Sequence, residues 1–174
     1  MSEMSKEIIF SRAVIQKRVQ EMADQISKDY AESDLIIIGI LKGAFIFMAD
    51  LIRAMNIPCK VDFVRVASYG AGTESFGKVV MTKDIETSIR GRDILIVEDI
   101  VDTGLTLRYL VDWLKERNPR SLKVCAFLDK RKGRKVSFEA DYLGFTIDDN
   151  FVVGYGLDFN EQYRSLPEVY VIKQ

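Results

Sequence analysis

This chain of 174 residues is poor in cysteine and proline, and neither sign of charge prevails in it. Its two cysteines, Cys59 and Cys125, each lie in an apolar or strand-like stretch, which favours reduced core thiols in the cytosol over a disulfide. The formal net charge of −1 excludes the overall positive field that holds non-specific binders on nucleic acid, so we expect no nucleic-acid partner. Because its three prolines form no linker and no repeat occurs, we expect residues 1–174 to make one domain.

The chain also lacks an apolar run that could cross a membrane. Its most apolar region, 35–51, is interrupted by Lys42 and Asp50. The opening residues, MSEMSKEIIFSR, contain no apolar segment of the kind found in a signal peptide. We therefore expect a cytoplasmic protein with no membrane partner, whose 48% of apolar residues can bury one core without disulfides or structural metals.

The hydrophobic pattern predicts alternating strands and helices. Apolar residues at helical spacing follow Ser11, a candidate N-cap, and predict an opening helix. Continuous apolar runs of strand length follow, several of them succeeded by helical spacing; they read LIIIGI, VDFVRVAS, DILIVEDI and KVCAFLD. This order predicts an α/β fold with a mainly parallel sheet flanked by helices, which binds ligands beyond the carboxyl ends of its strands. From Tyr142 the short pieces YLGF and FVVGYGL predict a small appendage, roughly 140–174, over that edge.

The segment from Ile94 to Leu107, ILIVEDIVDTGLTL, carries the strongest chemical signal. A strand that ends at Glu98 and Asp99 is followed by a polar turn and then by a helix. The helix N-terminus, a glycine and threonine hydroxyls suit a phosphate, whereas the two carboxylates suit ribose hydroxyls or magnesium. A sugar phosphate satisfies both halves. The alternative is an acidic turn with a simple Asp or Thr helix cap, and the residues alone leave it open.

Within this segment VEDIVDTGLTL resembles the phosphoribosyl-pyrophosphate signature of the type I phosphoribosyltransferases. The resemblance covers nearly the whole chain and narrows to the hypoxanthine-guanine phosphoribosyltransferases, with no departure at the motif positions. The further motifs are LKG at 41–43, SYG at 68–70, LDKR at 128–131, FVVGYGLDFNE at 151–161 and Arg164. It implies the type I phosphoribosyltransferase fold with a small C-terminal hood over the strand ends.

The resemblance implies a purine-salvage reaction. The 5-phosphoribosyl group of phosphoribosyl pyrophosphate passes to N9 of hypoxanthine or guanine, which gives IMP or GMP and pyrophosphate. A transition state like an oxocarbenium ion is expected, so the protein must hold the sugar, neutralise the leaving group and manage one purine proton. Asp102 would accept or steer that proton at N7, and it could also cap the following helix.

The resemblance also assigns the sugar and the metal. The backbone and hydroxyl groups of Asp102, Thr103, Gly104, Leu105 and Thr106 would bind the 5′-phosphate. Glu98 and Asp99 would hold the ribose hydroxyls, directly or through Mg²⁺ and water. Asp158 corresponds to the aspartate near a second Mg²⁺, a hard cation that keeps several waters and needs few protein carboxylates.

Pyrophosphate would be bound by Lys42, Gly43, Ser68, Tyr69 and Arg164. In this family the Leu41–Lys42 bond is often a non-proline cis peptide that exposes backbone N–H groups to pyrophosphate. The loop 68–77, with three glycines, would close over the substrate and exclude water. Without the resemblance, Lys42 is a solvated turn lysine, Arg164 a surface arginine and the loop an untethered hairpin tip.

Purine recognition would fall to the last third of the chain. Lys130 would donate to the purine O6, which selects 6-oxopurines because the exocyclic amine of adenine cannot accept that bond. Phe151 would stack on the base, although its pattern equally suits a core phenylalanine. Val152 would offer its backbone to the purine edge, and Asp158 would complete the purine-binding set.

Two other functions remain as alternatives. The basic run KRKGRK at 130–135 would suit a regulatory module that keeps the fold as a sensor and binds RNA or DNA. An enzyme of the same class could instead act on xanthine or a pyrimidine, but the Lys130 and Phe151–Asp158 matches disfavour a pyrimidine. Members of the family usually assemble, so a homodimer or homotetramer is expected.

Overall fold

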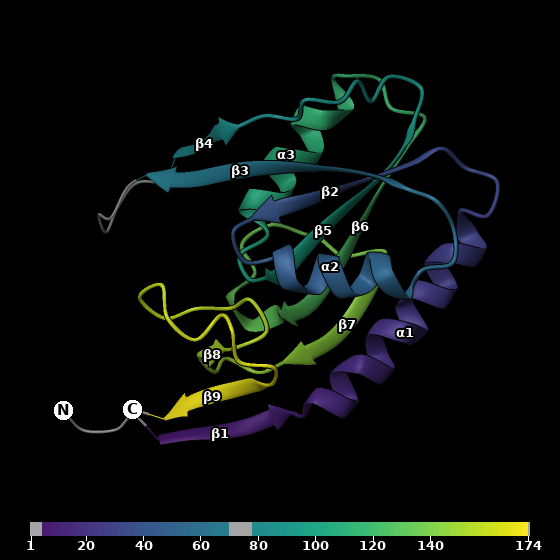
Figure 1. The fold of residues 1–174 in the computed structure, drawn as a ribbon. Helices are drawn as coiled ribbons and strands as arrows, with labels where there is room; N and C mark the ends of the chain where they lie inside the picture. The colour runs from purple at the N-terminus through teal and green to yellow at the C-terminus, as the bar shows by residue number, and fades with distance from the viewer. Residues whose placement is uncertain (1–4, 70–77, 174) are drawn as a thin grey trace.

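The protein, seen in a computed structural model that describes residues 5–69 and 78–173, is built around a six-stranded sheet (Figure 1). The strand order is β4-β3-β2-β5-β6-β7, and all neighbours are parallel except the antiparallel pair β3–β4. This confirms the predicted mainly parallel sheet. The strands are β2 (Leu35–Leu41), β3 (Lys60–Tyr69), β4 (Lys78–Lys83), β5 (Asp93–Val101), β6 (Ser121–Lys130) and β7 (Tyr142–Ile147).

Helices cover both faces of this sheet. The helices α1 (Arg12–Asp29) and α2 (Phe45–Ala54) pack together on one face, and α3 (Leu105–Lys115) lies on the other (Figure 1). As predicted, Ser11 caps α1: its hydroxyl accepts a hydrogen bond from the Val14 N–H. Within the described parts of the chain, no helix is both long and apolar enough to cross a membrane.

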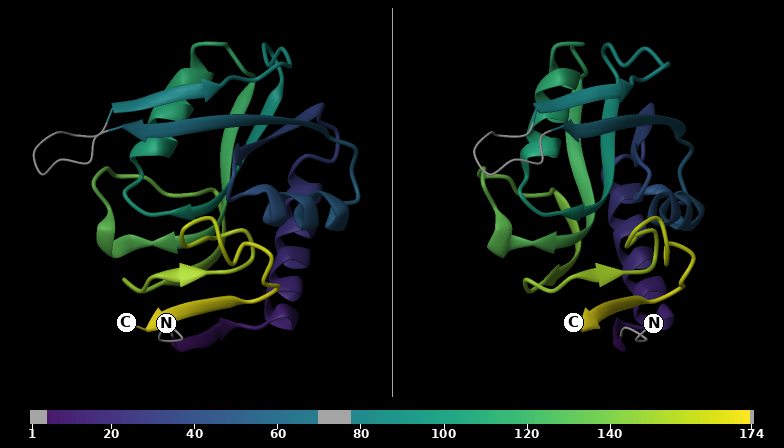
Figure 2. Two further views of the ribbon diagram at one scale, coloured as in Figure 1. Left: turned by 60° about the vertical axis from the view of Figure 1, so that its left-hand side comes forward. Right: turned by 90° about the vertical axis from the view of Figure 1, so that its left-hand side faces the viewer.

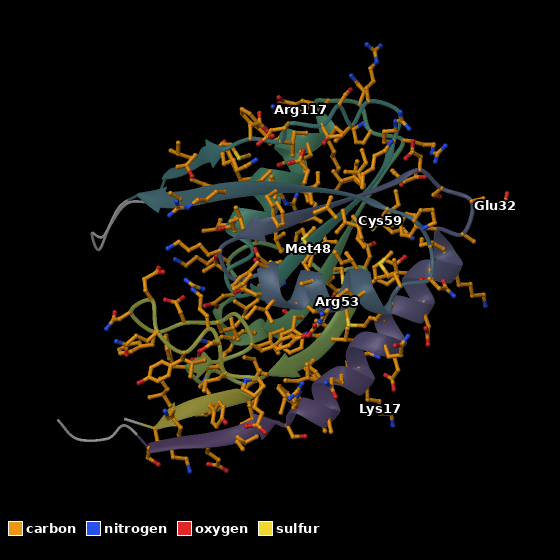
Figure 3. The ribbon with its side chains drawn as sticks, viewed as in Figure 1. Lys17, Glu32, Met48, Arg53, Cys59 and Arg117 are labelled. Carbon is orange, nitrogen blue, oxygen red and sulfur yellow. The ribbon has the colours of Figure 1, made fainter. Side chains whose placement is uncertain are left out.

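The core is divided in two by the sheet, because successive strand residues point to opposite faces. In β2, Ile37 packs with the α1–α2 cluster, whereas Ile36 and Ile38 pack with the cluster under α3. Side chains on the helices follow the same division: Met48 of α2 is buried, and Lys17 of α1 extends into solvent (Figure 3). Strands that are buried on both faces explain the continuous apolar runs in the sequence.

Both cysteines are free thiols, which agrees with the expected absence of a disulfide bond between them. Cys125 is fully buried in β6, and burial raises the pKa of its thiol above the ordinary value. Cys59 is half-buried just before β3 (Figure 3). Both side chains therefore act as small apolar groups of the core and its margin.

A second, smaller sheet lies beside the central sheet and differs from the expected appendage. Its strand order is β1-β9-β8, all antiparallel, with β1 (Ser5–Phe10), β8 (Val152–Val153) and β9 (Val169–Lys173). The first and last strands of the chain thus lie side by side, as the purple and yellow arrows show (Figure 2). The predicted piece YLGF belongs instead to β7, the edge strand of the central sheet, because Phe145 packs against the main core and pairs with Leu128.

Candidate active site

A turn between β5 and α3 forms the first part of the site. The helix α3 begins after Gly104, whose φ of +80° suits a residue without a side chain, and the Leu105 N–H bonds the Thr103 hydroxyl at 3.3 Å. First-turn N–H groups have no partner within a helix, so those of α3 are available to bind an anion. A cavity of about 100 Å³ opens here, lined by Glu98, Ile100, Val101, Asp102, Thr103, Gly104, Thr106 and Leu107.

These lining residues include most of the expected phosphate-binding set. Asp102, Thr103, Gly104 and Thr106 face the cavity, whereas Leu105 is not among its lining residues. The strand was expected to end at Glu98 and Asp99, but it continues to Val101. The reason is that Ile100 and Val101 still pair with β6, opposite Leu128 and Asp129.

Two adjacent carboxylates lie in the last part of β5. Glu98 is only 7% exposed, and its burial together with the neighbouring Asp99 carboxylate raises the pKa of Glu98 well above its ordinary value. Burial likewise raises the pKa of Asp99. A cation or a pair of hydroxyl donors at this point would relieve the repulsion between the two groups, which is the chemistry that a ribose or a metal supplies.

The turn after β2 packs directly on Asp99. The Leu41–Lys42 peptide bond is cis, in agreement with the expected geometry. A Cβ on Gly43 would lie 1.7 Å from Asp99 Oδ2, so only glycine fits this position. The Lys42 ammonium lies in solvent, where its Nζ pairs with Glu161 Oε2 at 2.8 Å. A turn lysine and a loop 119 residues away therefore meet at the rim of the site.

Arg164 is largely buried and is held by two neighbouring groups. Its Nη1 donates to the Gly156 carbonyl at 2.7 Å, and its Nη2 lies 2.9 Å from Asp158 Oδ1. The Nε atom is buried and has no hydrogen-bond partner in the structure. Arg164 is therefore not the plain surface arginine that its sequence context suggested; it is a largely buried cation with unused donor capacity.

A second cavity, of about 260 Å³, adjoins the first. Its lining residues are Asp99, Ile100, Asp102, Lys130, Asn150, Phe151, Val152, Leu157 and Asp158. Phe151 is 48% exposed and meets Phe159 edge-on at 5.5 Å, which makes the core-phenylalanine interpretation wrong. Val152 is buried in β8. The four residues expected to recognise a purine therefore line one hollow.

The two cavities share Ile100 and Asp102. Lys130, which lies at the end of β6, is 16% exposed; its Nζ is 3.3 Å from Asp149 Oδ1 and 4.0 Å from Asp102 Oδ2. The carboxylate of Asp102 therefore stands between a phosphate-sized cradle and a pocket with a cation in its wall.

The loop 68–77 is the expected lid. The loop 70–77 lies outside the described residues, and so do the side chains of Ser68 and Tyr69, whose backbone ends β3. The flanking strands β3 and β4 form an antiparallel pair.

Several residues that shape the site were assigned no role from the sequence. Asp149 is an acidic loop residue outside the matched motifs, and Glu161 is the last residue of the motif at 151–161; they pair with Lys130 and Lys42. Ile100 and Leu157 line the second cavity as apolar walls. Ile100, Leu157 and Glu161 lie inside the matched motifs, which was the available signal, whereas Asp149 lies outside them.

The basic run at 130–135 is partly offset by two carboxylates, Asp149 and Asp129. Lys130 and Lys132 pair with Asp149, and Arg131 and Arg134 pair with Asp129. Because four of its five cations share these two carboxylates, the run offers a polyanion less than five unpaired cations would. This arrangement speaks against the nucleic-acid sensor.

Within residues 5–69 and 78–173, no three histidine, cysteine or acidic side chains gather closely enough to hold a metal ion by themselves. The expected ligands Glu98 and Asp99 are adjacent in the sequence. Asp158 and Asp99 both line the second cavity. Hard carboxylate oxygens of this kind fit Mg²⁺, provided that substrate oxygens and waters complete its shell.

Comparisons with known proteins agree with this geometry. The family model of the phosphoribosyl transferase domain matches residues 7–160. A hypoxanthine-guanine phosphoribosyltransferase of Aquifex aeolicus is 48% identical over 160 residues, which cover 91% of this chain and 90% of that protein. One from Bacillus subtilis is 47% identical, covering 97% of this chain and 93% of that protein. A solved hypoxanthine-guanine phosphoribosyltransferase of Bacillus anthracis superposes with a TM-score of 0.93 at 43% identity, covering 98% of this chain and all of that one.

The chain therefore belongs to the phosphoribosyl transferase family. Its likeness within the family is to the hypoxanthine-guanine phosphoribosyltransferases, at 43–48% identity in the three relatives above. The predicted family, fold and enzyme class are confirmed.

Proposed function

We propose that this chain is the purine-salvage enzyme that transfers the 5-phosphoribosyl group of phosphoribosyl pyrophosphate to N9 of hypoxanthine or guanine. The products are IMP or GMP and pyrophosphate. One observation carries the proposal: a phosphate cradle and a pocket with a lysine in its wall meet at the carboxylate of Asp102. Joining a base to a sugar phosphate requires these two hollows to be adjacent.

The sugar phosphate would occupy the smaller cavity. Its 5′-phosphate would lie on the residues from Asp102 to Thr106, where the N-terminus of α3 supplies N–H donors and the favourable end of the helix dipole. Glu98 and Asp99 would accept from the ribose hydroxyls, directly or through magnesium-bound water. Burial raises the pKa of both carboxyl groups, and bound hydroxyl donors or Mg²⁺ would favour their ionised forms.

The pyrophosphate would lie between the two cations at the rim. Arg164 has a buried, unused Nε and a planar guanidinium suited to bidentate binding, and Lys42 can exchange Glu161 for the anion. Gly43 leaves its backbone open beside Asp99. Ser68 and Tyr69 would close from the end of β3.

The purine would occupy the larger cavity. Lys130 would donate to O6, and Phe151 would stack on the ring while Val152 offers its backbone to the purine edge. The exposure of the Phe151 side chain supports this role, because a free aromatic face is what stacking needs. Asp158, which also lines this cavity, would lie near the magnesium ion.

In the reaction the base would attack as pyrophosphate leaves. Asp102 would accept the N7 proton as positive charge develops in the purine, and Lys42 and Arg164 would hold the leaving group. Mg²⁺, held by Glu98, Asp99 and Asp158 with substrate oxygens, would neutralise part of the pyrophosphate charge.

We further propose that residues 1–174 act as one phosphoribosyltransferase domain in the cytoplasm, as a homodimer or homotetramer, with Mg²⁺ as cofactor. The part from roughly 140 onward would supply the purine hood together with β1, the strand that pairs with β9.

A spectrophotometric assay tests the function. The protein is mixed with phosphoribosyl pyrophosphate and Mg²⁺, and hypoxanthine, guanine, xanthine and adenine are added in turn. We expect turnover with hypoxanthine and guanine, weak or no turnover with xanthine, and none with adenine. If no 6-oxopurine gives a product, the proposed function is wrong.

A further inference from the structure

The turn that carries Asp102 is held from behind by one arginine. Arg134, which follows the short 3₁₀ helix η1 (Arg131–Gly133), donates from Nε to the Asp102 carbonyl at 3.0 Å. Its Nη1 donates to the Phe138 carbonyl, and its Nη2 pairs with Asp129. One guanidinium thus ties the turn to two other segments, and a planar fork with several donors is needed to do so.

Backbone contacts continue the same support. The N–H groups of Lys135 and Val136 lie 2.9 and 3.4 Å from the Thr103 carbonyl. A Cβ added to Gly104 would meet Val136 at 3.0 Å and Arg134 at 3.2 Å, and one on Gly133 would lie 2.3 Å from Asp102 Oδ1. The segment therefore packs against both the backbone and the carboxylate of the turn.

Asp129 orients this arginine. It is buried, and it is the neighbour of Lys130 at the end of β6. Lys130 lines the purine-sized cavity, whereas Asp129 lines a separate cavity of about 240 Å³ with Arg134 and Phe138. Successive side chains of a strand point to opposite faces, so the end of β6 can place Lys130 in the purine-sized cavity and Asp129 against Arg134.

Arg131 offers a matched comparison. It also binds Asp129, from Nε to Oδ2 at 3.0 Å. Its side chain is 66% exposed against 17% for Arg134, and it makes no hydrogen bond or ion pair with the turn from Asp102 to Gly104.

We propose that Arg134, oriented by Asp129, is a positioning residue that holds the Asp102–Gly104 turn in the shape that receives the 5′-phosphate. The proposal rests on the proposed function, since it assigns the turn to the sugar phosphate. It predicts that loss of Arg134 weakens phosphoribosyl pyrophosphate and leaves purine binding at Lys130 and Phe151 intact.

The test compares Arg134→Gln with Arg131→Gln. Calorimetry measures binding of phosphoribosyl pyrophosphate with Mg²⁺ and no purine, and kinetics give the KM for each substrate. We expect R134Q to weaken phosphoribosyl pyrophosphate about tenfold, the scale of losing hydrogen bonds from a charged group. Its KM for hypoxanthine should stay within about twofold, and R131Q should match the wild type. If the substitution only destabilised the fold, the fraction of active protein would fall, but the remaining protein would bind phosphoribosyl pyrophosphate and hypoxanthine as the wild type does.

Two further variants keep the test decisive. If R134Q does not fold, Arg134→Lys keeps a cation for Asp129 but cannot reach all three acceptors, and the same loss is expected from it. In a double-mutant cycle, Asp129→Asn should add little to R134Q, because Asp129 acts through Arg134.

The proposal is overturned if folded R134Q and R134K both bind phosphoribosyl pyrophosphate within twofold of the wild type. It is also overturned if R131Q is as defective as R134Q, or if the effects of D129N and R134Q simply add. A wild-type protein that binds phosphoribosyl pyrophosphate but turns over no purine would refute the proposed function while this binding comparison still stands.

Discussion

Each cation of the candidate site has an acidic partner within the chain. Lys42 pairs with Glu161, Arg164 with Asp158, and Lys130 with Asp149. The Lys42–Glu161 pair is exposed, and such a pair contributes little to stability, so an anionic ligand can replace the Glu161 carboxylate at small cost. Arg164 and Lys130 are largely buried in their pairs. The pairs keep the side chains near the positions in which substrates would need them.

Asp102→Asn tests the proton acceptor. The amide keeps the shape of the side chain but cannot take a proton, so kcat should fall about a hundredfold or more, the usual contribution of a general base. The KM values should change far less. Steady-state kinetics with hypoxanthine measure both.

Asp112→Asn, the same change on the exposed side of α3, is the control and should leave the kinetics unchanged. Unaltered kcat in D102N would show that Asp102 does not handle the purine proton.

Lys130→Ala tests the O6 donor. Loss of a charged hydrogen-bond donor should raise the KM for hypoxanthine about ten- to a hundredfold, with a smaller change in kcat. Lys132→Ala removes a neighbouring, 77% exposed lysine that also pairs with Asp149, and it should behave like the wild type. Unchanged hypoxanthine kinetics in K130A would refute the assignment of the O6 donor.

At the scale of elements, the entry into β5 and β6 is fixed by one buried carboxylate. Asp93, the first residue of β5, accepts from Arg120 Nε at 3.0 Å and from the Ser121 hydroxyl at 2.6 Å. The Arg120 hydrogen bond holds the pKa of Asp93 well below its usual range. Because β5 and β6 both lead to the site, this contact sets where the two strands start.

Asp93→Asn should make stability less dependent on pH. A carboxyl whose pKa is lower in the folded than in the unfolded protein stabilises the fold above its unfolded pKa and loses that contribution as pH falls through its folded pKa. The wild type should therefore be more stable than D93N by about 2 kcal/mol at pH 7. The difference should shrink as the pH falls below about 4.

Urea unfolding at a series of pH values measures this difference. The exposed Asp24→Asn, on α1, should cost little at any pH. A difference between wild type and D93N that did not shrink in acid would contradict the role given to ionised Asp93.

At the scale of the whole molecule, the two ends of the chain build one sheet beside the purine-sized cavity. The strand β1 pairs with β9, and β9 pairs with β8, which carries Val152. Phe151 precedes β8 and its N-terminal neighbour Asn150 lines the same cavity. The N-terminal strand β1 therefore supports the hood indirectly, through β9.

Deletion of residues 1–9 should raise the KM for hypoxanthine severalfold and leave the KM for phosphoribosyl pyrophosphate nearly unchanged. The reason is that β9 loses its ladder partner, whereas the turn from Asp102 to Gly104 does not depend on β1. Deletion of residues 1–4, which precede β1, is the control. Equal kinetics for both deletions would show that β1 does not support purine binding.

Much of the fold could be predicted because its signals are local. The opening helix is specified by Ser11 and its apolar stripe, and the central strands by apolar runs of strand length. The site motif from Glu98 to Thr106 is contiguous, so the strand, the turn and the helix N-terminus follow from neighbouring residues. The sequence by itself thus determined the fold class, the family and the phosphate end of the site.

Long-range contacts could not be predicted in the same way. Hydrophobic spacing shows that a strand exists but does not name its partner, so the pairing of β1 with β9 and the place of β7 in the central sheet came only from the structure. The pairs Lys42–Glu161 and Arg134–Asp102 depend on turns that bring distant side chains within hydrogen-bond reach. Only the tertiary structure decided which charges meet, because side-chain contacts follow from packing in space and not from spacing along the chain.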